Sequence, residues 1–234
     1  MSQELWKKLN PGGSSETIIS NEESLEFKDN WKASHVGHQQ RQFVNEELKQ
    51  FKEGKVPYVY NGFLELISLI EGDDLSFLDV GCATGYYGEI AAHKYPNKLR
   101  YSGCDYNEES INVAKSYYKN TPFSVQDITD MKFEDRQFDA VMVSGVFEHV
   151  PEQEKAFNET ARITKDWIIC HRIGLTHKEE HFTKGSQYDT PVVKYYFNRD
   201  KFIDRFTNRG FALKAFINVY PNNDNIQSYL FRRC

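Results

Sequence analysis

Short apolar runs alternate with helical patterns from Gly72 to about His171. Gly, Asp, Asn or Pro bounds the apolar runs, and these residues commonly end strands. The predicted strands are 76–80, 99–104, 123–126, 138–143 and 167–171. The predicted helices between them are 86–94, 110–118 and 152–163. Strands that alternate with helices in this way indicate parallel pairing through right-handed crossovers, in a doubly wound α/β sheet.

The N-terminal part of the chain has a different pattern. Phe43, Val44, Leu48 and Phe51 recur at helical spacing within 39–52, and a second helix is predicted to start near Pro57. Residues 1–34 are polar and contain a cluster of turn-forming residues at 10–15, which predicts a loose or lid-like leader with one short helix. We therefore expect an N-terminal helical lid or extension over 1–71 and a single compact domain over 72–234.

The C-terminal part begins with a segment that has no regular pattern. Residues 172–191 are polar and rich in His, and a connection of that length is unusual in a compact domain unless it is functional or disordered. A helix is predicted at 199–208. Apolar runs at 211–217 and 226–231, joined by a turn at 221–225, predict an antiparallel hairpin that closes the sheet edge.

Composition and charge narrow the class of protein. The chain has 29 basic and 34 acidic residues, scattered along its length, which gives a formal net charge of −5. A basic surface for nucleic acid or membrane is therefore not expected. No apolar run approaches the length that spans a bilayer, so a cytoplasmic protein is predicted. The four cysteines lie far apart, which indicates neither disulfides nor a zinc site.

Acidic residues stand at the ends of three successive predicted strands. Asp79 is followed by a turn with Gly81 and Gly85 that leads into a helix, and glycines there let a ligand approach the backbone. Asp105 ends the next strand, where a carboxylate can accept hydrogen bonds from ribose hydroxyls. Asp127 follows the third strand, where its carboxylate can accept a hydrogen bond from an adenine amine. Together they describe a pocket for an adenosine group.

At these residues the sequence resembles the class I S-adenosylmethionine-dependent methyltransferases, over about 75–169. The resemblance implies a Rossmann-like, mostly parallel seven-stranded sheet with an antiparallel last strand, S-adenosylmethionine as cofactor, S-adenosylhomocysteine as product, and no metal. One departure is Ala83, where members of the family usually carry Gly. The residues that the resemblance predicts to bind the cofactor are Asp79, Gly81, Cys82, Ala83 and Gly85 (methionine moiety), Asp105 (ribose), Asp127 and Ile128 (adenine), and Tyr106, Ser144 and Tyr60.

Histidines are the candidates for proton removal, because imidazole titrates near neutrality. His171, at the end of the fifth strand, is the best placed; a histidine simply packed at a strand end is the alternative. His149 follows the fourth strand in a segment similar to one that small-molecule methyltransferases place beside the sulfonium, although it and Glu148 can also be the start of a helix. His177 and His181 also fit H-x-x-E-H, but the segment is too short for a zinc-binding helix.

The expected function is methyl transfer to a hydroxyl of a small polar acceptor, such as a sugar or nucleotide-activated sugar, as in surface-polysaccharide tailoring. N-methylation of an amino sugar or small amine is one alternative, because an amine is already nucleophilic. A noncatalytic module that binds S-adenosylmethionine or a partner protein is the other. No nucleic-acid or membrane partner is expected, and the sequence leaves the oligomeric state open.

Overall fold

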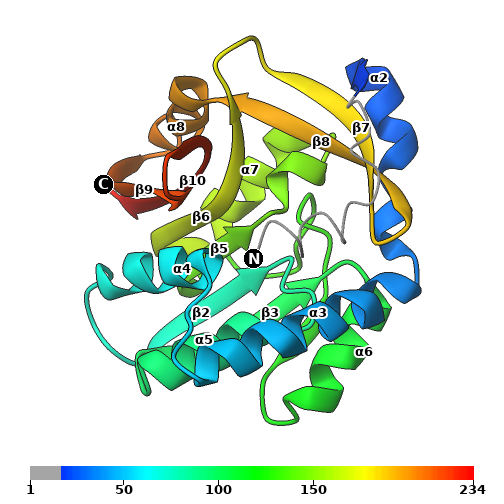
Figure 1. Cartoon of the computed structure of the whole chain (residues 1–234). Coiled ribbons are helices and arrows are strands. Elements are labelled where there is room, and N and C mark those ends of the chain that lie inside the picture. The colour runs from blue at the N-terminus through cyan, green and yellow to red at the C-terminus, as the bar shows by residue number, and fades with distance from the viewer. Residues whose placement is uncertain (1–16) are drawn as a thin grey trace.

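The structure, a computed structural model, describes residues 17–234 of the chain. Five parallel strands form the centre of the sheet in the spatial order β4-β3-β2-β5-β6 (Figure 1). They are β2 (Leu75–Val80), β3 (Leu99–Asp105), β4 (Phe123–Val125), β5 (Phe138–Ser144) and β6 (Thr164–Thr176). β10 (Asn223–Arg233) pairs antiparallel with β6, and β9 (Phe211–Tyr220) with β10. This confirms the predicted mostly parallel, Rossmann-like arrangement with an antiparallel last strand.

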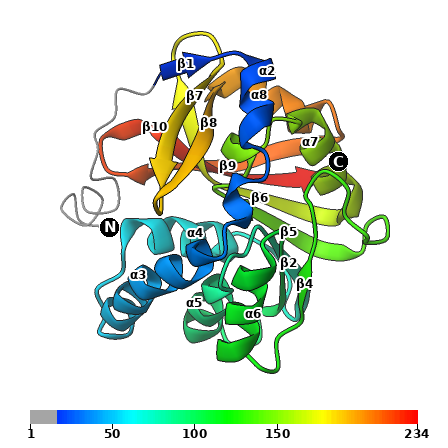
Figure 2. The same ribbon diagram turned by 90° about the vertical axis from the view of Figure 1, so that its right-hand side faces the viewer.

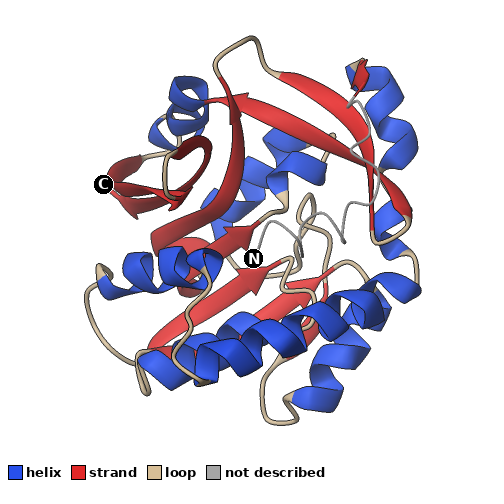
Figure 3. Cartoon of the chain, in the orientation of Figure 1, coloured by secondary structure: helices blue, strands red, loops and turns tan. Residues whose placement is uncertain are grey.

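Helices cover both faces of these strands, because successive side chains of a strand point to opposite faces and both sets are apolar here (Figures 2 and 3). Phe77 packs with one group of helices, and its neighbour Leu78 packs with the other. The first group is α3 (His35–Lys52), α4 (Tyr58–Ser68) and α5 (Tyr86–Lys94); the second is α7 (Gln153–Ile163) and α8 (Arg199–Thr207). Helix α6 (Glu108–Tyr117) packs against Phe123.

The N-terminal extension shares the core of the sheet. The two predicted helices are present as α3 and α4, and Leu48 and Phe63 lie in the same apolar cluster as Phe77. Before them lie β1 (Thr17–Ile19), α2 (Asn21–Ser24), η1 (Leu25–Phe27) and η2 (Asn30–Lys32). The part of the leader prediction that concerns residues 1–16 lies outside the described residues. That residues 1–71 form a separate lid stays a prediction.

The segment 172–191 is not irregular, and the prediction was wrong there. β6 continues to Thr176, and β7 (His181–Gln187) and β8 (Thr190–Asn198) form an antiparallel hairpin. β7 reads as polar because few of its side chains are buried. Tyr188 and Asp189 form its turn with φ of 49° and 55°, values that Asn-Gly pairs usually supply, so the turn carried no recognisable signal. β8 pairs with the end of β6, and β1 pairs with β7, so the sheet formed by residues 17–234 has three strands more than predicted.

Candidate functional site

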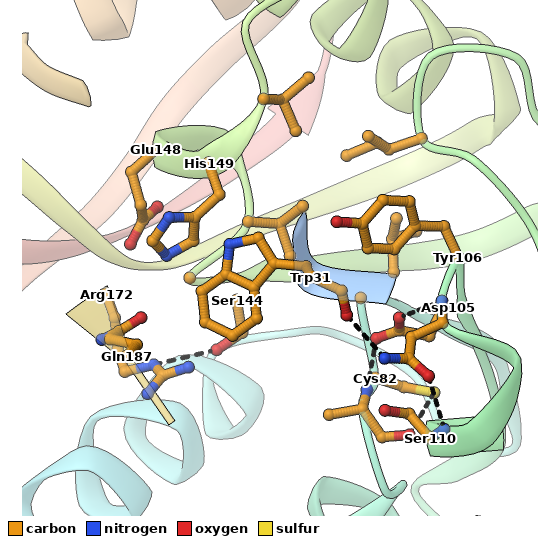
Figure 4. A pocket seen from close by; sticks show the side chains of 18 of the residues that line it. Trp31, Cys82, Asp105, Tyr106, Ser110, Ser144, Glu148, His149, Arg172 and Gln187 are labelled. Atoms are coloured by element: carbon orange, nitrogen blue, oxygen red, sulfur yellow. Dashed lines mark hydrogen bonds between the residues drawn. The ribbon is translucent and has the colours of Figure 1, made fainter. Parts of the chain in front are cut away.

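A cavity of about 290 Å³ lies at the carboxyl ends of the parallel strands (Figure 4). It is lined by the turn after β2, the end of β3 and the segments that follow β4 and β5. Trp31 and Val36, from η2 and the start of α3, and Tyr188, from the hairpin turn, also line it. Doubly wound sheets bind ligands at this edge, and the volume is at the lower end of the roughly 300–1,000 Å³ typical of small-molecule pockets.

The turn after β2 brings the backbone to the cavity. Gly81 has a φ of 72°, in the left-handed region that glycine adopts without strain. The N–H groups of Gly81 and Cys82 both donate to the carbonyl oxygen of Cys104, at 2.7 and 2.9 Å. A Cβ atom on Gly81 would lie 2.2 Å from Cγ2 of Val146. The turn is therefore held against β3 on one side and against the segment after β5 on the other.

Asp105 is the last residue of β3 and lines the cavity. Its carboxylate accepts hydrogen bonds from the backbone N–H groups of Ala83 and Asn107, both at 2.9 Å. Burial raises the pKa of Asp105, and these hydrogen bonds oppose that shift because they stabilise the charged form. Each carboxylate oxygen has a second lone pair, so Asp105 can accept further hydrogen bonds from ligand hydroxyls in the cavity.

The segment after β4 adds a carboxylate beside apolar surface. Oδ1 of Asp127 accepts hydrogen bonds from the N–H and hydroxyl of Thr129, at 2.9 and 2.7 Å. Ile128 is 7% exposed and lines the cavity, as do Asp127, Trp31 and Tyr106. Aromatic and apolar surface beside an acceptor oxygen suits a flat ring with polar edges, such as adenine.

Asp79 does not line the cavity, although it was predicted to bind the cofactor. Its side chain is fully buried and points to the same face as Phe77, because residues two apart in a strand share a face. Oδ2 of Asp79 accepts a hydrogen bond from the hydroxyl of Tyr101 at 2.6 Å. Burial raises the pKa of Asp79 to about 7. In the structure, Asp79 is therefore tied to Tyr101 of β3 and does not face the cavity.

Gly85 and Tyr60, also predicted to bind the cofactor, lie outside the cavity lining as well. Gly85 has a φ of 75° at the start of α5, and a Cβ atom there would lie 2.5 Å from the ring of Phe123. Tyr60 is 1% exposed, and its hydroxyl donates to Glu47 at 3.0 Å. Both residues have packing roles that their positions in the sequence did not distinguish from contacts with a ligand.

Three of the four candidate histidines are placed away from the cavity. His171 is fully buried between β10 and α4, with Nδ1 2.7 Å from the hydroxyl oxygen of Ser228, and burial lowers its pKa well below the usual value. The side chain of His177 is 79% exposed, and His181 begins β7. Residues 177–181 form no helix, which agrees with the rejection of the H-x-x-E-H motif.

His149 is the candidate histidine that lines the cavity. Its Nδ1 lies 2.6 Å from the carbonyl oxygen of Val193, and its ring packs on Trp31 with the centroids 4.7 Å apart. A carbonyl oxygen only accepts, so Nδ1 carries the proton of the neutral ring and Nε2 remains an acceptor. Burial lowers the pKa of His149 to about 4, so the ring is neutral at pH 7.

The low pKa of His149 predicts a loss of stability in acid. An unfolded histidine binds a proton below its ordinary pKa of about 6.5, whereas folded His149 resists protonation until about pH 4. The free energy of unfolding should therefore fall as the pH drops, by up to about 2 kcal/mol from this group between about pH 7.5 and pH 5. Chemical denaturation at the two pH values should show a smaller fall for His149→Asn than for the unaltered chain, and an equal fall would contradict the assignment.

Several residues that line the cavity were not predicted from the sequence, among them Arg172 and Glu148, which lie across the cavity from Asp105 (Figure 4). Arg172 follows His171 and donates from Nε to the hydroxyl oxygen of Ser144, at 3.2 Å. Glu148 is 6% exposed, and its Oε2 has no hydrogen-bond partner among residues 17–234. Further lining residues that were not predicted include Tyr86, Tyr87, Gln187, Lys194 and Tyr220. Most of these lie on elements that meet only in the folded chain, so no local sequence signal identifies them.

Over residues 17–234 no cluster of three or more His, Cys, Asp or Glu side chains is arranged to hold a metal ion. Within the same part of the chain, no helix combines the length and apolar character needed to cross a membrane.

The fold is that of solved S-adenosylmethionine-dependent methyltransferases, and the predicted resemblance to the class I enzymes is confirmed. Residues 78–167 match the model of the methyltransferase domain family.

Individual relatives agree with this class. A ubiquinone/menaquinone biosynthesis C-methyltransferase of Campylobacter jejuni is 28% identical over 119 residues, which cover 49% of this chain and 51% of that protein. The chain thus spans about half the length of the curated relatives it matches. A solved 1,6-didemethyltoxoflavin-N1-methyltransferase of Burkholderia thailandensis, with S-adenosylhomocysteine bound, has a TM-score of 0.65 at 11% identity and covers 93% of this chain and 92% of its own. A methyltransferase structure from Methanosarcina mazei has a TM-score of 0.61 at 17% identity, over 72% of this chain and 96% of that one.

Proposed function

We propose that the protein transfers a methyl group from S-adenosylmethionine to a small-molecule acceptor. The observation that carries this proposal is one cavity lined by the Gly81 turn, Asp105 and Asp127, from three successive strand ends. S-adenosylmethionine consists of a methionine moiety, a ribose with two hydroxyls and a flat adenine ring. In the proposed binding mode these parts contact the Gly81 turn, Asp105 and Asp127 in that order along the sheet. The match of residues 78–167 to a methyltransferase domain supports the same function.

The residues fit the cofactor at each part. Asp105 would hold the ribose through its remaining lone pairs, and Asp127 with Ile128 would hold the adenine. Gly81 would let the methionine moiety approach the backbone, because it has no side chain. A larger residue at this position would clash with Val146. Tyr106 and Ser144, both cavity-lining, are further proposed contacts. When bound, S-adenosylmethionine supplies a methyl carbon made electrophilic by its positive sulfur.

The chain must then orient the acceptor and take up its proton. Glu148 replaces the predicted His171 as the candidate base, because it is buried and lines the cavity. Burial raises the pKa of Glu148, which makes its carboxylate a stronger base than an exposed one. Nε2 of His149 is a second acceptor of a proton or a hydrogen bond on the same wall.

The lining favours an acceptor with a flat ring. Tyr86, Tyr87, Tyr188 and Tyr220 all line the cavity, and aromatic side chains pack well on planar ligands. Two relatives, from Campylobacter jejuni and Thermotoga maritima, are named for methylation of quinones or demethylmenaquinone, which supports the same preference. A sugar or nucleotide-activated sugar, an amino sugar and a small amine stay predictions that no contact here favours.

The test is transfer of label from methyl-labelled S-adenosylmethionine. The protein is incubated with hydroxylated quinones, phenols, sugars, nucleotide sugars and amines, and label is followed into product together with the formation of S-adenosylhomocysteine. We expect label in at least one acceptor with a flat ring, that is, a hydroxylated quinone or a phenol. Label in sugars or amines alone would reject the ring preference. Tight binding of S-adenosylmethionine with no transfer to any acceptor would favour the noncatalytic alternative.

A further inference from the structure

Arg172 presents a guanidinium group to the cavity that no described carboxylate pairs with. Its hydrogen bond is from Nε to Ser144, and within residues 17–234 no carboxylate oxygen lies within 4 Å of it. Nη1 and Nη2 have no hydrogen-bond partner among these residues, and both atoms remain accessible to solvent. Arg172 therefore has four N–H donors available to a ligand.

The surroundings of Arg172 hold this group in place. Arg172 has a φ of 62°, an uncommon conformation for a residue with a side chain, and such strain concentrates at functional sites. A Cβ atom on Gly145 would lie 2.8 Å from Nη2 of Arg172, so Gly145 leaves the space that the guanidinium occupies. Tyr86, Tyr87 and Tyr220 lie within electrostatic range of it. The cation is thus positioned by the fold.

A second positively charged side chain lies at the end of the cavity that Arg172 lines. Lys194 also lines it, and both Lys194 and Arg172 act electrostatically on Glu148 and His149. Glu148 is the carboxyl group that lines the cavity beside these two cations, and its single negative charge would not offset both of them. Asp105 lies on the opposite side of the cavity from Arg172 (Figure 4). The half of the cavity away from the proposed ribose site therefore attracts an anion.

We propose that Arg172, together with Lys194, binds an acidic oxygen group of the acceptor, so that the acceptor is an anion such as a carboxylate, a phosphate or an ionised hydroxyl compound. This proposal rests on the proposed function. A guanidinium binds a carboxylate or phosphate through two parallel hydrogen bonds, so it fixes the orientation of the acceptor as well as its charge. Arg172 is then a determinant of substrate specificity.

The first experiment measures binding of small probes to the protein saturated with S-adenosylhomocysteine. The probes are benzoate, inorganic phosphate and the neutral analogue benzamide, with dissociation constants from ligand-observed NMR. We expect benzoate or phosphate to bind at least tenfold tighter than benzamide, Arg172→Gln to abolish that preference, and Arg172→Lys to keep part of it. Arg100→Gln, at an exposed arginine paired with Asp74, should leave it unchanged. No preference in the unaltered chain, or a preference that persists in Arg172→Gln, would overturn the proposal.

A second arm separates the acceptor from the cofactor's own carboxylate. Arg172→Gln should change the dissociation constants of S-adenosylhomocysteine and of 5′-methylthioadenosine, which lacks the carboxylate, by less than about threefold each. A tenfold loss for S-adenosylhomocysteine alone would assign Arg172 to the cofactor and reject the acceptor site. Absence of S-adenosylhomocysteine binding to the unaltered chain would reject the proposed function, so the two failures are distinguishable.

Discussion

Asp105→Ala should weaken the binding of S-adenosylhomocysteine by about 100-fold or more. Hydrogen bonds to a charged group contribute about 1.5–3 kcal/mol each, so losing two from a ribose costs about 3 kcal/mol or more. The substitution also removes the acceptor for the N–H of Ala83, which helps to hold the turn after β2. Calorimetric titration measures the change, and thermal unfolding checks that the variant is folded.

Two variants control this result. Asp105→Asn keeps one acceptor oxygen, so its affinity should lie between those of the unaltered chain and Asp105→Ala. Asp130→Asn changes an exposed carboxylate that pairs with Lys132, and it should bind S-adenosylhomocysteine as the unaltered chain does. A folded Asp105→Ala protein that loses less than about threefold in affinity would contradict the assignment of Asp105 to the ribose.

Gly81→Ala should destabilise the protein and abolish measurable binding of S-adenosylhomocysteine. Gly81 has a φ of 72°, and a left-handed conformation costs a residue with a Cβ atom about 1–2 kcal/mol. The new Cβ atom would also lie 2.2 Å from Cγ2 of Val146, so one of the two segments that line the cavity must move, at a further cost of about 1–3 kcal/mol. Chemical denaturation and calorimetry measure the two effects.

Gly54→Ala is a matched control for the backbone strain. Gly54 has a φ of 86°, and no atom lies within 4 Å of the position of an added Cβ atom. Its substitution should cost about 1–2 kcal/mol of stability and leave binding unchanged. If Gly81→Ala costs no more than Gly54→Ala and binds S-adenosylhomocysteine equally well, the close packing of the turn against Val146 has no role in the site.

The central sheet could be predicted because local pattern and global fold agree there. β2 to β5 are short apolar runs bounded by turn residues, and the helix patterns between them follow helical spacing. The β7–β8 hairpin could not be predicted, because β7 is polar and its turn uses Tyr188 and Asp189 at positive φ. Tertiary contacts with β1 and β6 decide its structure.

The lining of the cavity at the strand ends could be predicted in large part, for the same reason. Gly81, Asp105 and Asp127 are each adjacent to a strand end, so sequence position alone brings them to one edge. Asp79 was misplaced because it lies inside β2, where alternation turns its side chain to the face of Phe77. The part of the cavity lining that contains Arg172, Glu148 and Lys194 was not predicted, because these residues come from β6, η3 (Phe147–His149) and β8, which only the fold brings together.

The most direct test of the claim that this cavity is an S-adenosylmethionine site is a calorimetric titration of the unaltered chain. We expect S-adenosylmethionine and S-adenosylhomocysteine to bind with micromolar dissociation constants at one site per chain, and NAD to give no heat of binding. Absence of binding by both sulfur compounds, or binding of NAD in their place, would contradict the claim and leave only the fold established.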